Sequence, residues 1–429
     1  ESIPVKGKSD HAVELKYTRH GPVVYEDEKN HKAYAVRCAW LEPGGAPYLA
    51  SLRMDQAKTW EEFREACNYS HIPGENMVWA DTDGNIGWQA VGIAPVRKNF
   101  SGMVPVPGDG RYEWDGYLPI VEKPHSLNPD SGFIATANQN VTPEDYDHWE
   151  AIGYSWSDPF RGNRIEEVLG REGPLDLEAM KSLQVDYLSL PARELVPYLK
   201  DLSLDGKAGA ARALLMDWDF RLEPGSVPAA IYVAWENAIG DLADQRFIPE
   251  AAKDYLRWLQ LERILQWIRE PGTHFRTPEA RDEFLKEAFQ MGLSELTERL
   301  GPDMGRWEYG QEALKHIEIS HPLSSLVADS LSRGWDLGPL PRGGNGYTPG
   351  STGNNYNQSS GATFRVIIPV GDWERTLGIN SPGQSGDPRS PYYDNLFDLW
   401  ARDGYFPLRY SRDSIVKHAD SKWVLLPKD

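Results

Sequence analysis

Gly-Phe-Ile-Ala-Thr-Ala-Asn-Gln-Asn, residues 132–140, is the stretch on which the interpretation of this chain depends. Small and apolar residues lead into the amides, which predicts a strand that ends in Asn138 at the end of a sheet. An uncharged NH2 placed there can donate to the oxyanion that forms when an acyl carbon is attacked, and such a donor contributes about 3–4 kcal/mol. Asparagine is also common in turns, so the spacing alone leaves a simple turn-forming role open for Asn138.

A helix is predicted to open shortly afterwards, at Asp-Pro-Phe-Arg-Gly-Asn-Arg-Ile, residues 158–165. From this point to residue 300 the apolar residues recur with helical periodicity. The predicted helices cover residues 164–169, 177–185, 192–199, 208–218, 229–239, 251–269 and 278–300.

The residues before this stretch predict short strands. Alternation or β-branched residues favour strands at 13–18, 23–25, 34–40 and 49–54, with a charged loop at 26–30. A helix is predicted from Thr59, which stands three residues before Glu62 as in a capping box. Asp83-Gly84-Asn85 predicts a tight turn between two strands. Asp81 and Asp83 resemble the start of a calcium loop, but the later bidentate Glu is missing.

After residue 340 the chain predicts a loop to residue 360, a strand at 362–370 and an amphipathic helix at 392–400. Between the last two, Gly383-Gln384-Ser385-Gly386 is one residue short of a nucleophile elbow, so we predict a backbone turn there and no nucleophile.

Bulk composition limits the possible partners. The 429 residues can bury a large core, as two or three domains or as one layered domain. The net charge of −19 argues against binding to nucleic acid or to an anionic membrane. No apolar run approaches the roughly 20 residues that cross a bilayer. Cys38 and Cys67, the only cysteines, are expected to be buried thiols.

Several ordered motifs resemble the β chain of the penicillin acylase family of N-terminal-nucleophile (Ntn) hydrolases. They are His-Gly-Pro-Val-Val at 20–24, residues 75–88, residues 183–193, Trp-Glu-Tyr-Gly at 307–310, and the glycine-rich box at 381–391. The resemblance runs from Thr18 to about Pro427. In the box, Ser381 and Pro382 replace a proline and a glycine of the family pattern.

The resemblance implies an α+β fold, the four-layer αββα sandwich of Ntn hydrolases with a large helical layer. Residues 1–164 would be the β-rich part of the core, 165–340 the helical region, and 341–429 a segment that returns to the core. The family's nucleophile is the first residue of the β chain, whereas this chain begins Glu1-Ser2. We therefore expect one structural unit completed by an α chain and by the N-terminal part of the β chain, which carries a nucleophilic Ser. We also expect the chain to be stable only with those partners, because it would otherwise expose sheet edges.

The family's site residues can be transferred to matching positions. Asn138 corresponds to the oxyanion asparagine, and Arg161 to an arginine beside the catalytic amine; a surface salt bridge is the alternative for Arg161. Thr136 and Ala137 would line the acyl pocket of a small N-acyl substrate. The small Ala137 suggests a roomier pocket than one fitted to a phenylacetyl group.

The resemblance further implies a structural calcium ion, with Glu150 as a carboxylate ligand and Gly102 as a carbonyl ligand. It also implies autoproteolytic processing and a periplasmic or secreted location. His20 invites a general-base role, but the family mechanism uses no histidine, so we favour a structural role.

Three functions remain open at this point. The first is an amidase of the penicillin acylase or acyl-homoserine-lactone acylase type. The second is a non-catalytic relative that binds or scaffolds. The third, from composition alone, is a carbohydrate-active enzyme with paired carboxylates in an aromatic cleft.

Overall fold

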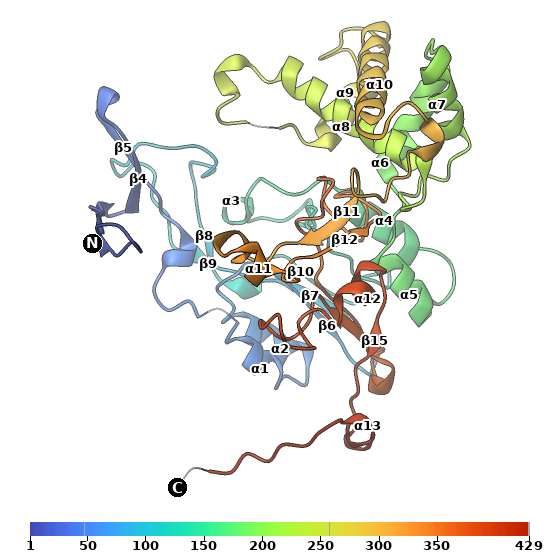
Figure 1. Cartoon of the computed structure of the whole chain (residues 1–429). Coiled ribbons are helices and arrows are strands. Elements are labelled where there is room, and N and C mark those ends of the chain that lie inside the picture. The colour runs from blue at the N-terminus through green and yellow to red at the C-terminus, as the bar shows by residue number, and fades with distance from the viewer. Residues whose placement is uncertain (47, 257, 428–429) are drawn as a thin grey trace. The chain divides into compact units, whose positions relative to one another are not determined.

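The computed structural model (Figure 1) describes residues 1–46, 48–256 and 258–427. Its internal contacts define two compact units. The first unit comprises residues 1–136 and 140–156, and the second comprises residues 137–139 and 157–429. The turn at 137–139 therefore packs with the second unit although its chain neighbours belong to the first. The division into residues 1–164, 165–340 and 341–429, which the family resemblance implies, stays a prediction. The expectation that other chains complete this structural unit also stays a prediction. No helix in the described ranges is both long and apolar enough to cross a bilayer.

The first unit is made of short antiparallel strands that pair as β1-β2, β3-β4-β5, β10-β7-β6 and β8-β9. Its short helix α3 (Trp149–Ile152) comes last. The strands are β1 (Ser2–Ile3), β2 (His11–Ala12), β3 (Tyr17–Thr18), β4 (Gly21–Asp27), β5 (Lys32–Ala35), β6 (Asn76–Ala80), β7 (Ile86–Ala90), β8 (Ala94–Pro95), β9 (Tyr117–Leu118) and β10 (His125–Leu127).

The predicted hairpins of the first unit are confirmed in part. The strand expected at 13–18 is limited to β3, and the one expected at 34–40 ends at Ala35. The charged loop is present as a 3-10 turn, in which the Asp27 carboxylate accepts from the backbone N–H of Asn30 at 3.1 Å. At the second hairpin, Oδ1 of Asp81 accepts from the backbone N–H groups of Asp83 (3.0 Å) and Asn85 (2.9 Å). That carboxylate organises a turn, as the hairpin prediction requires.

The strand predicted at 49–54 is wrong, because this segment ends in the helix α1 (Ser51–Met54). Its leucine and methionine favour helix over strand. Arg53 also ties it to the next helix: its guanidinium lies 2.9 Å from the Glu65 carboxylate and over the Tyr69 ring.

Helix α2 (Trp60–Cys67) provides the main core of the first unit. The Thr59 hydroxyl accepts from the Glu62 N–H at 3.2 Å, which confirms the predicted N-cap. Trp60, Phe63 and Cys67 form a buried cluster with residues of the β6-β7 region. Burial raises the pKa of the Cys67 thiol to about 11, whereas Cys38 is only half-buried, so the expectation of two buried thiols holds for Cys67 alone.

The part of the second unit between residues 160 and 300 is mainly helical, as predicted. Its helices are α4 (Phe160–Leu169), α5 (Leu177–Gln184), α6 (Leu190–Leu195), α7 (Gly206–Met216), α8 (Val227–Phe247), α9 (Leu261–Arg269) and α10 (Pro278–Leu300). Side chains of Asp176, Ser189, Ser226 and Thr277 cap four of these helices at the N-terminus. The helix predicted at 251–269 begins only at Leu261, and Arg257 within that range lies outside the described residues.

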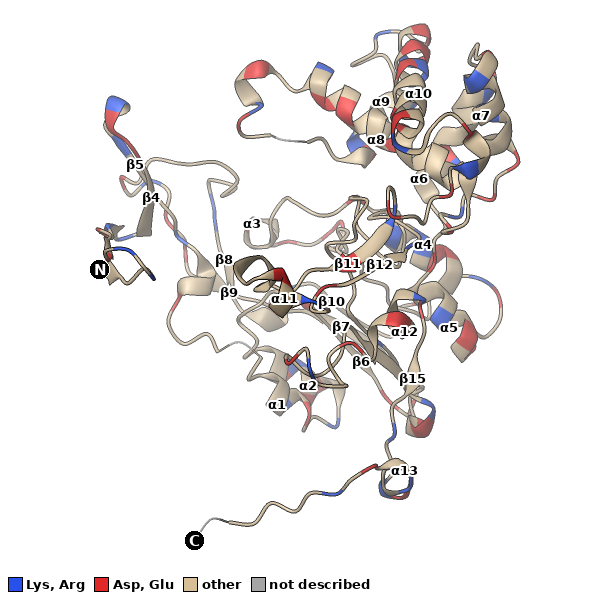
Figure 2. Ribbon diagram, in the orientation of Figure 1, with Lys and Arg blue, Asp and Glu red and all other residues tan. Residues whose placement is uncertain are grey.

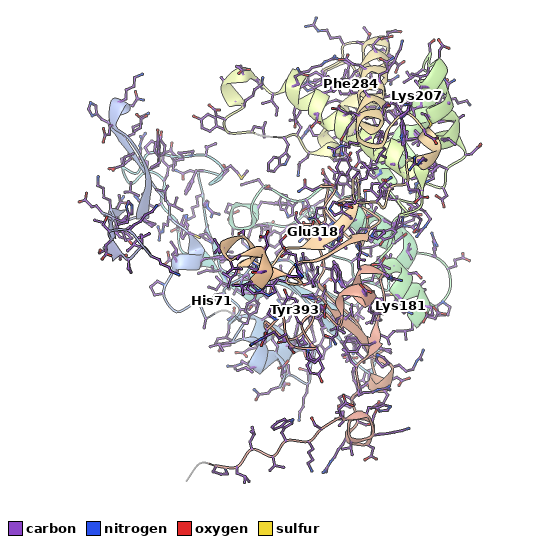
Figure 3. The ribbon with its side chains drawn as sticks, in the orientation of Figure 1. His71, Lys181, Lys207, Phe284, Glu318 and Tyr393 are labelled. Atoms are coloured by element: carbon purple, nitrogen blue, oxygen red, sulfur yellow. The ribbon has the colours of Figure 1, made fainter. Side chains whose placement is uncertain are left out.

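The core of the second unit centres on the packing of α8 against α10. Gly292 lets the two backbones approach, since a Cβ atom there would lie 2.8 Å from the Ala234 carbonyl carbon. The rings of Trp235 and Phe289 meet edge to face at 5.5 Å. Phe284, which is labelled in Figure 3, belongs to the same cluster. Acidic and basic residues are interspersed along α10 (Figure 2).

The C-terminal part of the second unit contains β11 (His316–Ile319), β12 (Leu337–Pro341), β13 (Phe364–Ile367), β14 (Leu377–Asn380), β15 (Phe406–Pro407), α11 (Asp329–Ser332), α12 (Phe397–Ala401) and α13 (Arg412–His418). The strand predicted at 362–370 is confirmed in part, as the shorter β13, which pairs with β14. The helix predicted at 392–400 is wrong for its first half. There the Tyr392 carbonyl accepts from the N–H groups of Gln384 and Ser385, which holds the segment against the preceding loop.

Candidate active site

The turn at 137–139 carries the first candidate residue. No strand includes residues 132–138, so the predicted strand is wrong, and Asn138 lies instead in a bend with φ of 66°. Asparagine tolerates this left-handed conformation better than most residues. Its carbonyl oxygen accepts from the Ser157 N–H at 3.0 Å, which holds the turn to the segment before α4. The Asn138 side chain is exposed.

Arg161, the second residue of α4, reaches this side chain. Its Nη2 donates to Oδ1 of Asn138 at 2.8 Å. A guanidinium can only donate, so the oxygen of the amide must face Arg161 and the NH2 must face the other way. No described residue accepts a hydrogen bond from that NH2. The pair therefore presents a neutral donor, oriented by a cation and open to a ligand.

The alternative role of Arg161, a surface salt bridge, finds no support. Within the described ranges no carboxylate lies in ion-pair distance of its guanidinium. Burial lowers the pKa of Arg161 from its ordinary value, but the side chain remains protonated at physiological pH. The guanidinium of Arg161 is thus held by its hydrogen bond to the side-chain oxygen of Asn138.

The start of α4 is held from both sides. The Asp158 carboxylate accepts from the Glu262 N–H at 3.2 Å, and burial raises the pKa of Asp158. The ring of Phe160 packs edge to face on Tyr347 at 5.5 Å. Because these contacts fix the first turn of the helix, they also fix the position of Arg161.

Two residues that sequence reasoning missed also contact the turn. Gln139 is buried and its side chain bonds the Ala137 N–H, and Gly162 lies directly against the Gln139 amide. A buried amide in a run of small residues was the signal available for Gln139. Nothing in the sequence pattern indicated Gly162.

The predicted pocket residues lie next to Asn138 in the chain. Ala137 is buried with 8% exposure, and Thr136 is half-buried. Their role in acyl binding stays a prediction.

The predicted calcium ligands both lie in the first unit. Glu150 has His148 as a neighbour, with 4.0 Å between Nδ1 and the carboxylate. Gly102 lies against the guanidinium of Arg97, a neighbour that opposes binding of a cation to its carbonyl. In the described part of the chain no cluster of three or more His, Cys, Asp or Glu side chains is suited to a metal. Glu150 and Gly102 do not form a calcium site by themselves, and the calcium prediction stays untested.

The rejected candidates have structural partners. His20 Nε2 lies 2.9 Å from the Glu113 carboxylate, which Arg19 also contacts, as expected for a structural histidine. The Ser385 hydroxyl accepts from the Asp387 N–H at 3.1 Å within a loop, as expected for a backbone turn.

Comparison with known proteins gives a consistent result. A family model described as penicillin amidase matches residues 1–417. The penicillin acylase 2 proenzyme of Pseudomonas sp. (strain SE83) is 27% identical over 449 residues, which cover 100% of this chain and 56% of the relative. An acyl-homoserine lactone acylase of Pseudomonas fluorescens (strain Pf0-1) is 28% identical, over 95% of this chain and 53% of the relative. The chain thus spans just over half the length of these curated relatives.

The fold comparison agrees. The structure of a thermostable penicillin G acylase from Alcaligenes faecalis matches with a TM-score of 0.76 and 21% identity, over 100% of this chain and 81% of that chain. This confirms the predicted α+β fold of the Ntn-hydrolase type.

Proposed function

This chain belongs to the penicillin amidase family, and on that premise we propose that it is the larger part of the β chain of an N-acyl amidohydrolase. The enzyme would remove an acyl group from a penicillin-like or other N-acyl substrate. The observation that carries the proposal is the bond from Arg161 to the Asn138 oxygen, which turns the amide NH2 outward.

The chemistry requires a hydroxyl with an adjacent base, since a hydroxyl alone is a weak nucleophile near neutral pH. In the proposed reaction, a free α-amine takes the proton of its own residue's hydroxyl while the oxygen attacks the amide carbon. The C–N bond then breaks, the amine leaves with a proton, and water releases the acyl group from the oxygen. The nucleophile would come from the N-terminal part of the β chain, processed autoproteolytically from a precursor.

Asn138 would act when the carbonyl oxygen becomes negative. Its NH2 is a neutral donor already oriented before the reaction, so little reorganisation accompanies charge development. The bond strengthens as the oxygen gains charge, and it therefore stabilises the transition state more than the bound substrate.

Arg161 would have two effects. It orients Asn138, and its charge disfavours protonation of a nearby ammonium, which keeps more of the base free. Replacing it by Gln should therefore raise the apparent pKa of the acid limb of kcat/KM, besides lowering kcat. A pH profile in which only the height changes would contradict the second effect.

The proposal is tested most directly with Asn138→Leu in the complete gene product. Leucine keeps the volume but removes the NH2, so kcat for any accepted N-acyl substrate should fall by about 10²–10³-fold. Release of the free amine provides the assay. Mass spectrometry of the purified enzyme would list every N-terminus and identify the nucleophile.

Asn163→Leu is the matched control, because Asn163 is an exposed asparagine on the same helix as Arg161. It should leave kcat unchanged. Equal activity of Asn138→Leu and the natural enzyme would remove the oxyanion role of Asn138, whereas a natural enzyme that cleaves no N-acyl substrate would remove the proposed reaction.

The acyl group is the second question. The relatives include a penicillin acylase and acyl-homoserine lactone acylases, so both substrate classes are candidates. The small side chain of Ala137 favours aliphatic acyl groups over phenylacetyl groups. Rates on N-acyl-homoserine lactones of increasing chain length, measured against benzylpenicillin, decide between them.

The other inferences from the resemblance remain part of the proposal: an α chain partner, a calcium ion, and a periplasmic or secreted location. A non-catalytic binding or scaffold role is the alternative, and it predicts no turnover of any N-acyl substrate. A cavity of about 620 Å³ beside α5 has a single carboxylate, Asp176, and no tryptophan in its lining, so this cavity does not offer the paired carboxylates and aromatic groove of the carbohydrate alternative.

A further inference from the structure

A buried glutamine, Gln139, follows the proposed oxyanion donor in the chain. Its side-chain oxygen accepts from the backbone N–H of Ala137 at 2.6 Å, across the turn that has Asn138 at its centre. Both Ala137 and Gln139 are only 8% exposed, so water has little access to this N–H group. The Gln139 side chain thus satisfies the Ala137 N–H, which a backbone carbonyl would satisfy in a helix or a strand.

The conformation of Asn138 depends on this closure. A φ of 66° is uncommon for a residue other than glycine, and it persists only where surrounding contacts support it. The contacts that support this conformation include the Gln139 bond to the Ala137 N–H, the Ser157 N–H bond to the Asn138 carbonyl and the Arg161 bond to the Asn138 side chain. If the first contact is lost, Asn138 can relax toward ordinary conformations, and its side chain then points elsewhere.

Gly162 of helix α4 packs directly against the Gln139 side chain. A Cβ atom at Gly162 would lie 2.4 Å from both Cδ and Nε2 of Gln139, so the Gln139 amide would have to leave its present position to make room for it. Gly162 directly follows Arg161 in the helix. The contact that locks the Gln139 side chain therefore also sets how closely Arg161 approaches Asn138.

We propose that Gln139 and Gly162 are positioning residues, a latch that holds the Asn138 amide and the Arg161 guanidinium in the geometry for oxyanion stabilisation. The inference rests on the proposed function and assigns no contact between the latch and the substrate. All four residues lie in the second unit, so the latch does not depend on how the two units are arranged.

The test uses Gln139→Met in the complete enzyme, since methionine fills the space but has no strong acceptor for the Ala137 N–H. We expect kcat to fall by about 10²-fold, the effect of misplacing a catalytic group by about 1 Å. KM should stay within about twofold. Affinity for a boronic acid that mimics the tetrahedral intermediate should fall by the same factor as kcat, while affinity for the product carboxylic acid should not change.

The second variant is Gly162→Ala, which places a methyl group where the Gln139 amide lies. Alone it should lower kcat by at least about 10-fold, and the additional change Gln139→Ala should relieve the collision. The combined loss should therefore be smaller than the product of the two single losses, as expected for coupled neighbours. If Gln139→Met does not fold, this pair of variants decides the question.

Gln358→Met is the matched control. Gln358 is also buried, and its side-chain oxygen also accepts a hydrogen bond, from Arg342 Nε at 2.8 Å. It should lower the melting temperature without changing the ratio of boronate to product-acid affinity. If Gln139→Met behaves like this control, the latch is wrong.

Failure of the latch and failure of the proposed function can be told apart. A natural enzyme that cleaves N-acyl substrates and loses activity in Asn138→Leu, but not in Gln139→Met, overturns the latch alone. A natural enzyme that cleaves none of them overturns the proposed function, and the latch falls with it.

Discussion

The two compact units differ in how they bury their apolar residues. The second unit has a large helical core, in which Trp235, Phe289 and many aliphatic side chains are fully buried, and a smaller cluster that includes Trp400. The first unit has small separate clusters, and large apolar side chains on its strands remain exposed, including Val24 (62%) and Val78 (63%). Strand β6 shows the contrast locally: Met77 and Trp79 face the cluster, while Val78 between them faces outward.

This difference indicates which parts of the candidate site are well supported. Asn138 and Arg161 belong to the unit with the large core. Thr136, Glu150 and Gly102 belong to the unit with the small clusters. The expectation that the chain needs partner chains for stability therefore applies most to the first unit, and it stays a prediction.

The largest effect is expected from emptying the core of the second unit. Phe289→Ala should lower the free energy of unfolding by about 3–5 kcal/mol, because a fully buried aromatic ring leaves a cavity. Hydrogen exchange of amides in α8 and α10 measures the loss. Met291→Ala, two residues away on the same helix and 39% exposed, should change stability by no more than about 0.5 kcal/mol. Comparable losses for the two variants would contradict the packing described here.

A smaller effect is expected in the first unit. Gly87→Ala would place its methyl 2.4 Å from Cζ3 of Trp60, so overpacking should cost about 1–3 kcal/mol. Hydrogen exchange in β6 and β7 should rise while exchange in α10 stays the same. Gly74→Ala is the control, since its methyl would meet only the Val91 carbonyl oxygen at an ordinary 3.6 Å. Equal loss of protection in both units would show that they unfold together and would end the distinction between them.

The smallest effect concerns a carboxyl group in the core of the second unit. Glu236 accepts from Asn345 Nδ2 at 2.8 Å and bonds the Tyr232 hydroxyl, and burial raises its pKa from 4.5 to about 8. The folded state thus holds a proton that the unfolded state releases, so its contribution to stability falls as pH rises from about 4.5 to about 8. Relative to Glu236→Gln, the free energy of unfolding of the natural chain should fall by at most about 1.4 kcal/mol for each pH unit in this range. Denaturant unfolding of both proteins at pH 6 and pH 7 measures the change, and a constant difference would mean that Glu236 is ionised in the core.

Much of the fold could be predicted from local pattern. The Thr59 cap, the Asp83 turn and most helices between residues 160 and 300 follow from propensity, capping and periodicity. The failures occurred where tertiary contacts overrode local preference. The segment predicted as a strand at 49–54 ends in a helix, in which Arg53 contacts Glu65 and Tyr69. Where a helix was expected from residue 392, the Tyr392 carbonyl instead accepts hydrogen bonds from the preceding loop.

The sequence by itself determined the family, the residue types of the candidate site and the helical character of the second unit, because motif order and hydrophobic period are written along the chain. Only the tertiary structure decided three features of the site. Asn138 lies in a left-handed turn, Arg161 donates a hydrogen bond to its side-chain oxygen, and Gly162 packs against the side chain of Gln139. These contacts join residues more than 20 positions apart through hydrogen bonds and close packing. Such contacts depend on distances in space, and no local pattern encodes those distances.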